Sequence, residues 1–213
     1  MVGNALYYGD NLAVLRESIA TESVALIYLD PPFNSQATYN LLFQSPTGEG
    51  SEAQIEAFDD TWHWGPEAAD AFDQVIRSGN TNVADMLRAM RSFLGDNDMM
   101  AYLAMMAIRL IELRRVLKPN GSLYLHCDPA ASHYLKIVLD SIFGKRHLRR
   151  EIVWRSGWVS GFKTRTRNWI RNHDTIFYYL KGEEADCTFN KIYKPHGKNY
   201  SRRGGVKTLS ALL

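Results

Sequence analysis

The segment that most constrains the fold is a run of six residues, Val24-Ala25-Leu26-Ile27-Tyr28-Leu29. The run is almost continuously apolar, which is typical of a strand that is buried on both faces of a parallel sheet. It stops at Asp30-Pro31-Pro32. A loop therefore begins at the carboxyl end of a strand that we expect to lie inside the sheet.

The rest of the chain alternates between strand and helix patterns. Further strands are predicted at residues 5–8, 122–126, 151–154 and 174–180, helices at residues 12–19, 99–117 and 131–143, and a turn at residues 118–121. This alternation predicts a doubly wound α/β sheet, whose ligands bind beyond the carboxyl ends of the strands. The loop at Asp30 lies at such an end.

Residues 44–98 depart from this alternation and form an acidic insertion with several glycines and patterns for short helices. The insertion contains the aromatic residues Phe58, Trp62 and Trp64. We expect Trp62 and Trp64 to pack within the insertion rather than to contact a ligand. After residue 183 the pattern fades, and residues 210–213 end the sequence without completing an element.

Charge is distributed unevenly along the chain. The first 100 residues hold 15 acidic and 4 basic side chains, whereas residues 101–213 hold 8 acidic and 21 basic ones. A basic C-terminal part suits contact with a polyanion, because Lys and Arg displace counterions from phosphates. Charge alone fits a solvated basic surface equally well.

A basic loop at residues 155–173 helps to decide between contact with a polyanion and a solvated basic surface. Its basic residues are interleaved with aromatic ones: Lys163, Arg165, Arg167 and Arg171 with Trp158, Phe162 and Trp169. Such a mixture supplies phosphate contacts and stacking surfaces for a nucleic acid. Because the loop joins two strands that should end near the Asp30 loop, we favour DNA contact over a merely solvated loop.

Several classes of protein are not expected. The N-terminus lacks a basic region followed by an apolar run, and the longest apolar stretch is interrupted by Arg109, Glu112 and further charges, so we expect a cytoplasmic protein without a membrane segment. Cys127 and Cys187 lack the spacing of a redox pair or a zinc site. Neither a structural disulfide nor a bound metal is expected.

Successive blocks of the sequence resemble one family. Residues 8–12 (Tyr-Gly-Asp-Asn-Leu), 24–34, 113–128, 151–154 and 173–179 are similar to consecutive motifs of the β-class site-specific DNA amino-methyltransferases, and the similarity extends to about residue 190. It implies a Rossmann-like methyltransferase fold, S-adenosyl-L-methionine as the cofactor and double-stranded DNA as the partner. In this family Asp before the two prolines goes with adenine N6 more often than with cytosine N4. The resemblance therefore implies N6-methyladenine as the product.

The motif Asp30-Pro31-Pro32-Phe33 carries the chemistry that this resemblance implies. The prolines stiffen the loop. Adenine N6 is a poor nucleophile because its lone pair is delocalised into the ring, and acceptors for its hydrogens favour a more tetrahedral nitrogen that can attack. The Asp30 carboxylate and the Pro31 carbonyl can accept these hydrogens, and Phe33 can stack on a flipped base. A purely structural Asp-Pro turn is the competing interpretation.

The resemblance also assigns cofactor contacts. It places Asp10, Asn11 and Leu12, together with Asp30, near S-adenosyl-L-methionine. Asp10 also stands where a helix N-cap is expected, and the two roles are compatible.

Three polar residues suggest a metal site, namely His126, Asp128 and His133. Methyl transfer from a sulfonium needs no metal, and Asp128 can simply cap the helix that follows it. We therefore assign no metal ligands.

The sequence departs from the family in one respect. β-class chains are circularly permuted, so a glycine-rich cofactor loop follows the catalytic block, yet Gly204-Gly205 lacks the strand before it and the acidic residue after it. We expect a catalytic domain at residues 1–190 and a basic tail at residues 191–213 that leads to a missing C-terminal part. Exposed sheet edges would then favour a homodimer or a complementary C-terminal polypeptide as partner.

Three interpretations stay open at this point. The first is the catalytic region of a DNA adenine-N6 methyltransferase. The second is an inactive or split-subunit fragment that binds DNA through its basic loops. The third is a related enzyme that methylates cytosine N4, RNA or a protein amide.

Overall fold

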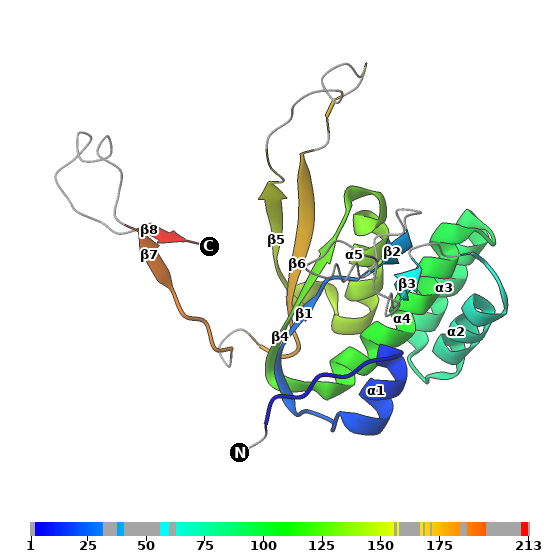
Figure 1. The fold of residues 1–213 in the computed structure, drawn as a ribbon, viewed down its shortest axis with the longest axis horizontal. Coiled ribbons are helices and arrows are strands. Elements are labelled where there is room, and N and C mark those ends of the chain that lie inside the picture. The colour runs from blue at the N-terminus through cyan, green and yellow to red at the C-terminus, as the bar shows by residue number, and fades with distance from the viewer. Residues whose placement is uncertain are drawn as a thin grey trace, which may run out of the picture.

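The computed structural model describes residues 3–31, 38–40, 56–59, 63–155, 157, 167, 169–170, 172–183, 187–194 and 210–212, the three short segments 38–40, 56–59 and 210–212 by backbone alone. A four-stranded sheet organises the chain, in the order β1 (Val24–Leu29), β4 (Leu117–Cys127), β6 (His173–Leu180) and β5 (Leu148–Arg155). β1 and β4 are parallel, and β6 is antiparallel to both of its neighbours (Figure 1). The fold is therefore mixed α/β, as the sequence predicts, but the expectation of a doubly wound sheet was wrong for the described residues, because their helices lie on one side of the sheet only (Figure 1).

The helices lie on one side of this sheet (Figure 1). They are α1 (Asn11–Ser18), α2 (Pro66–Arg77), α3 (Thr81–Leu94), α4 (Asp98–Val116) and α5 (Pro129–Phe143), with a 3-10 turn η1 at Lys145–His147. α4 and α5 supply fully buried side chains such as Leu103, Leu110 and Leu135, which join Leu123 and Leu125 of β4 in one core. This packing fixes the sheet against the helical layer.

Side-chain caps begin three of these helices, as the local sequence dictates. The backbone N–H of Leu12 donates to Asp10 Oδ1 at 3.1 Å at the start of α1. The N–H of Met100 donates to Asn97 Oδ1 at 2.9 Å in α4, and that of Ala131 donates to Asp128 Oδ1 at 3.0 Å in α5. The expected capping roles of Asp10 and Asp128 are confirmed.

Two further pairs of strands lie outside the main sheet. β2 (Thr38–Asn40) pairs with β3 (Glu56–Asp59), and β7 (Ile192–Lys194) pairs with β8 (Ser210–Leu212), both antiparallel. β8 shows that the expectation of no completed element at residues 210–213 was wrong. Three residues that pair with a distant strand leave no recognisable period in the sequence.

Two other predictions about strands were wrong. Residues 5–8 form no strand in the structure, and Leu6 is 99% exposed. β1 is not buried on both faces, because Ile27 is buried whereas Leu26 and Tyr28 are 57% and 55% exposed. The apolar character of a segment indicates that it tends to be buried. Whether a layer is present to bury each face depends on other parts of the chain.

The turn predicted at residues 118–121 lies inside β4. Leu117 aligns with Val24 and Ser122 aligns with Leu26, so four residues of β4 bulge opposite one residue of β1. Gly121 allows this close approach, because a Cβ there would lie 2.8 Å from Leu117 Cδ1 and 3.0 Å from the carbonyl oxygen of Ala25. In the part of the chain that the structure describes, no helix has the length and apolar character needed to cross a membrane.

Candidate active site

Asp30 follows β1 directly and meets a histidine and a second aspartate there. His126 Nδ1 lies 2.9 Å from Asp30 Oδ1, and His126 Nε2 lies 3.7 Å from Asp174 Oδ2. The His126 and Asp174 side chains are each 17% exposed, whereas that of Asp30 is 63% exposed. The imidazole is thus held in the protein between two carboxylates, one of which is open to a ligand.

The sheet register explains why these three residues meet. Leu29 aligns with Leu125, so the next positions, Asp30 and His126, are neighbours at the carboxyl ends of two parallel strands. β6 runs the other way and begins at the same edge, which brings Asp174 diagonally across from His126. Three separate strands therefore deliver the cluster to one edge of the sheet.

The remaining catalytic predictions are only partly covered by the structure. Pro31 is half-buried beside Asp30. Pro32 and Phe33 lie outside the described residues. Sequence reasoning considered His126 only as a metal ligand and missed Asp174 as a site residue. Among the described residues, no group of three or more His, Cys, Asp or Glu is arranged to hold a metal ion.

The predicted cofactor residues form a second polar cluster, held by α4. Arg109 Nη2 donates to Asp10 Oδ1 at 2.7 Å, and Arg109 Nε donates to Asn11 Oδ1 at 2.7 Å. The Asp10 side chain stays 54% exposed, whereas that of Arg109 is 15% exposed. Leu12 is buried in the core, so its side chain serves packing.

The basic loop is described at a few positions. Arg167 is exposed and Trp169 is 97% exposed, while Lys163, Arg165 and Arg171 lie outside the described residues. Arg155 at the end of β5 aligns with His173 at the start of β6, so the loop between them leaves and rejoins the sheet at the edge where Asp30 lies. The predicted proximity of the loop ends to the Asp30 edge is confirmed by this register.

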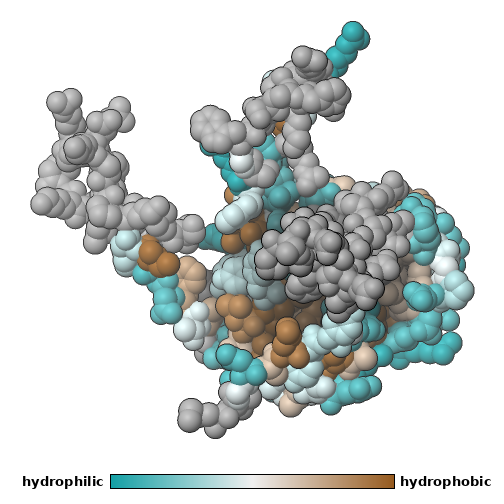
Figure 2. Space-filling view, in the orientation of Figure 1, coloured by the Kyte–Doolittle hydropathy of each residue, from teal (hydrophilic) through white to brown (hydrophobic). Residues whose placement is uncertain are grey.

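The face of the sheet opposite the helices is apolar and partly exposed. This open face is defined by Leu26, Tyr28, Tyr124 and Ile152, which lie on the side of the sheet away from the core residues Ile27, Leu123 and Leu125, while Tyr178 on the same side is buried. Tyr124 and Tyr178 stack with their ring centroids 4.6 Å apart. Figure 2 shows hydrophobic surface where the sheet lies beside the helical layer. Within the described residues β1 pairs with β4 alone, so its other edge has no strand partner there.

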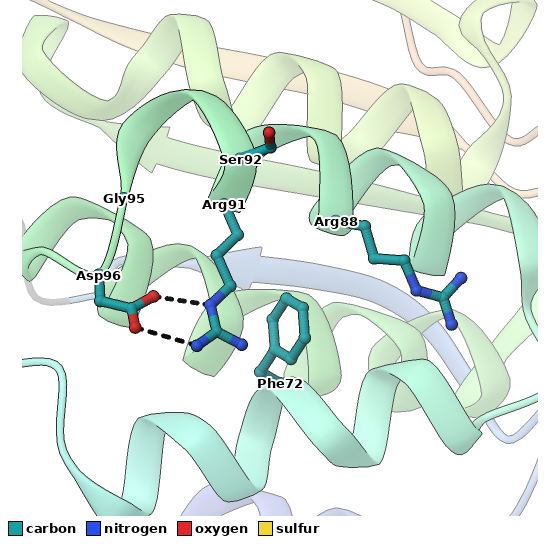
Figure 3. Close-up of a pocket in the computed structure, with 6 residues that line it drawn as sticks. All are labelled: Phe72, Arg88, Arg91, Ser92, Gly95 and Asp96. Carbon is teal, nitrogen blue, oxygen red and sulfur yellow. Dashed lines mark hydrogen bonds and ion pairs between the residues drawn. The ribbon is translucent and has the colours of Figure 1, made fainter.

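A surface hollow of about 610 Å³ lies in the helical insertion, away from Asp30. Figure 3 shows its lining residues, Phe72, Arg88, Arg91, Ser92, Gly95 and Asp96. Arg91 donates to both carboxylate oxygens of Asp96, at 2.6 and 3.0 Å, and this contact lowers the pKa of Asp96.

The same guanidinium lies 4.4 Å from the ring centroid of Trp64 and 4.9 Å from that of Phe72. Arg91 therefore joins the insertion helices, and the prediction that Trp64 packs within the insertion is confirmed. Trp62 lies outside the described residues.

Comparison with known proteins places this geometry in context. The family model described as "DNA methylase" matches residues 24–208. The chain is 24% identical over 182 residues to the type III restriction-modification enzyme EcoP15I Mod subunit of Escherichia coli, covering 84% of the chain and 24% of that protein. It is 27% identical over 154 residues to the StyLTI Mod subunit of Salmonella typhimurium, covering 71% of the chain and 20% of that protein.

A third relative is a type II methyltransferase, M.EcaI of Enterobacter cloacae. It is 27% identical over 182 residues, covering 85% of the chain and 30% of that protein. The chain thus spans less than a third of the length of each of these curated relatives.

Proposed function

The chain belongs to the DNA methylase family, and we propose that it carries the catalytic part of an enzyme that methylates adenine N6 in DNA. The observation that carries this proposal is the exposed Asp30 carboxylate at the carboxyl end of β1, fixed on one side by His126. Open α/β sheets bind their ligands at such strand ends.

Asp30 and Pro31 act on the amino group of the target base. The Asp30 carboxylate and the Pro31 carbonyl accept its two hydrogens, which pulls the N6 lone pair out of conjugation with the ring. The N6–C bond forms as the methyl carbon leaves its sulfur, and the surplus proton on nitrogen passes to Asp30 and then to solvent. The acceptors gain strength as positive charge develops on nitrogen, so they favour the transition state over the ground state.

The base must leave the duplex before this reaction. Its amino group cannot line up with the methyl donor inside the base stack, so the adenine is flipped out. Phe33 then stacks on the flipped base, a contact worth roughly 1–3 kcal/mol, and the stiff Asp30-Pro31-Pro32 turn fixes its position.

The methyl donor in this proposal is S-adenosyl-L-methionine, which supplies an activated methyl group when it is bound. The residues present suit such a molecule, because the partly exposed carboxylates of Asp10 and Asp30 attract positively charged and amino groups. Arg109 orients the Asp10 and Asn11 side chains, and the buried Leu12 holds α1 in place beneath them.

DNA lies along the basic loop in this proposal. Arg167 and Trp169 are exposed on that loop, which begins and ends at the Asp30 edge. Lys163, Arg165 and Arg171 supply further phosphate contacts, whose strength falls steeply as salt rises.

The domain organisation belongs to the same proposal. Residues 1–190 form the catalytic domain, with an insertion at 44–98 and a DNA-facing loop at 155–173, and residues 191–213 form a basic tail. The order of the parts is circularly permuted, and a complementary C-terminal polypeptide supplies the rest of the cofactor pocket. Support comes from the open face and from the β1 edge that has no strand partner among the described residues.

An inactive fragment that binds DNA without transferring methyl groups is the second candidate, because Arg167 and Trp169 are exposed on the basic loop. The test is transfer of tritiated methyl groups from S-adenosyl-L-methionine to duplex DNA, followed by hydrolysis and separation of the nucleosides. It is run with this chain alone and with any polypeptide encoded directly downstream. The proposal predicts label in N6-methyladenine, and label in N4-methylcytosine would contradict it.

A further inference from the structure

We propose that His126 is the positioning residue of Asp30. The inference rests on the proposed function of Asp30. It adds one residue to the site, because His126 is not required by the chemistry of the Asp-Pro-Pro-Phe motif itself.

The geometry assigns a direction to the first contact. An ionised carboxylate only accepts hydrogen bonds, so at 2.9 Å the hydrogen lies on His126 Nδ1 and points to Asp30 Oδ1. That contact occupies one oxygen of Asp30, and the second oxygen can receive the amino group of a base without displacing the imidazole. The carboxylate is thereby prevented from rotating.

Packing of the largely buried His126 side chain keeps the ring from turning. Asp174 Oδ2 lies 3.7 Å from His126 Nε2, and both side chains are only 17% exposed. His126 lies on β4 and Asp174 lies on β6, which are the two inner strands of the sheet. Neither residue can therefore move far without disturbing a paired strand. A largely buried histidine therefore transmits the position of the sheet to Asp30.

Positioning matters because Asp30 follows the last residue of β1 and is itself 63% exposed. A carboxylate in that setting samples several rotamers unless a neighbour holds it. Misplacement of a reacting group by about 1 Å can cost on the order of 10²-fold in rate. His126 therefore acts on the chemical step rather than on the binding of DNA.

The first test reads the imidazole directly and needs no activity. Long-range nitrogen–proton spectra, recorded where the ring is neutral and assigned with His126→Asn, report which nitrogen carries the hydrogen. We expect the Nδ1–H form for His126 in the unaltered chain and a shift toward the Nε2–H form in Asp30→Ala. An identical spectrum in both proteins would overturn the proposal, even if no methyl transfer is detected.

The second test separates kcat from KM. His126→Leu should lower kcat for methyl transfer by roughly 10- to 100-fold, with KM for DNA and for the methyl donor changed less than twofold. His126→Asn places an amide N–H near the Nδ1 position and should restore kcat to within about fivefold of the unaltered chain. Unchanged kcat in His126→Leu, or a loss that appears only in KM, would overturn the positioning role.

A matched control exists in the insertion. His63 Nδ1 lies 3.0 Å from Asp98 Oδ1, the same kind of pair, but with side chains 71% and 42% exposed. His63→Leu removes an equivalent contact far along the chain and should leave kcat unchanged. An equal loss of kcat in His63→Leu and His126→Leu would show that the effect is general destabilisation, and it would overturn the proposal.

Discussion

Two exposed aspartates of the site are each held by one basic side chain from another element. His126 holds Asp30, and Arg109 holds Asp10. In both pairs the basic side chain is mostly covered, at 15% and 17% exposed, and the carboxylate is more than half exposed. This arrangement leaves carboxylate oxygens accessible to a ligand while the position of each carboxylate is fixed by the core.

Replacing Arg109 tests the second of these pairs. Its guanidinium donates to Asp10, to Asn11 and to the carbonyl oxygen of Met105. Arg109→Met should lower the free energy of unfolding by about 1–2 kcal/mol, because several charge-assisted hydrogen bonds are lost. Urea denaturation measures the change. Arg88→Met is the control, because its exposed pair with Asp85 is worth less than about 0.5 kcal/mol. Equal changes in the two variants would contradict the structural role of Arg109.

At this scale the sequence predicted the position of Asp30 at the end of a strand and the capping role of Asp10, because each depends on its immediate neighbours. It did not predict the pairing of His126 with Asp30 and Asp174. That pairing depends on the register of three strands, which no local pattern specifies. The alternation along β4 offered one usable signal, since His126 takes the face opposite that of Leu125 and Cys127.

Among the elements, β4 and β6 carry four weakly acidic side chains whose pKa is raised by burial, two in the core and two on the other side of the sheet. Burial raises the pKa of Cys127 to about 12, and it also raises the pKa of Tyr124, Tyr178 and Tyr179. Tyr179 in addition donates to Asp140 Oδ1 at 2.8 Å, which ties β6 to α5. These groups are protonated in the folded protein under conditions where an unfolded chain would begin to ionise.

The alkaline stability of the protein should reflect these shifts. Each folded pKa lies above its unfolded value, near 8.5 for Cys and 10 for Tyr, so the stabilisation is complete below those values and is lost as pH rises through the folded pKa. The free energy of unfolding should therefore fall continuously from about pH 9 to about pH 12. Urea midpoints measured across this pH range test the prediction. In Cys127→Ala the midpoint should depend less on pH at the lower end of the range. Constant midpoints between pH 8 and pH 11 would argue against the buried, protonated core.

Helix capping gives a second prediction at the scale of elements. Asn97 accepts from the N–H of Met100 at the start of α4, whereas Asn80 makes no side-chain capping hydrogen bond at the start of α3. Asn97→Ala should cost about 1 kcal/mol of stability, and Asn80→Ala should cost less than half of that. Thermal or urea unfolding distinguishes the two. The idea fails if Asn80→Ala is the more damaging change.

Most helices and strands were predictable, because each has its own hydrophobic periodicity or its own capping residue. The helices at residues 99–117 and 131–143 correspond to α4 and α5, and the later strands correspond to β4, β5 and β6. The burial of β1 was not predictable, because apolar content does not reveal whether a second layer is present. The short strands β7 and β8 were missed because three-residue pairs leave no periodic signal.

Across the whole molecule, the helices cover one side of the sheet and leave the open face of Leu26, Tyr28, Tyr124 and Ile152 (Figure 1). An exposed apolar face beside an unpaired strand edge is a surface for association. We expect the isolated chain to self-associate through it at micromolar concentrations, typical of a modest interface.

Paired substitutions locate this surface. Tyr28→Ser should weaken self-association by about tenfold, since one aromatic side chain at the centre of an interface contributes at least that much. Phe93→Ser is the control, because Phe93 is 72% exposed but lies on α3, in the helical layer. Sedimentation velocity over a concentration series gives the dissociation constants. A larger effect of Phe93→Ser would place the association surface on the helices instead.

Asp30 is proposed to stabilise the transition state of methyl transfer to adenine. The most direct test is the single-turnover rate of methyl transfer to saturating duplex DNA by Asp30→Ala and by Asp85→Ala, an exposed aspartate of α3 used as a control. Asp30→Ala should lower this rate by roughly 10²- to 10³-fold while DNA affinity is retained, and Asp85→Ala should leave the rate unchanged. A rate that is the same in Asp30→Ala and the unaltered protein would contradict the account.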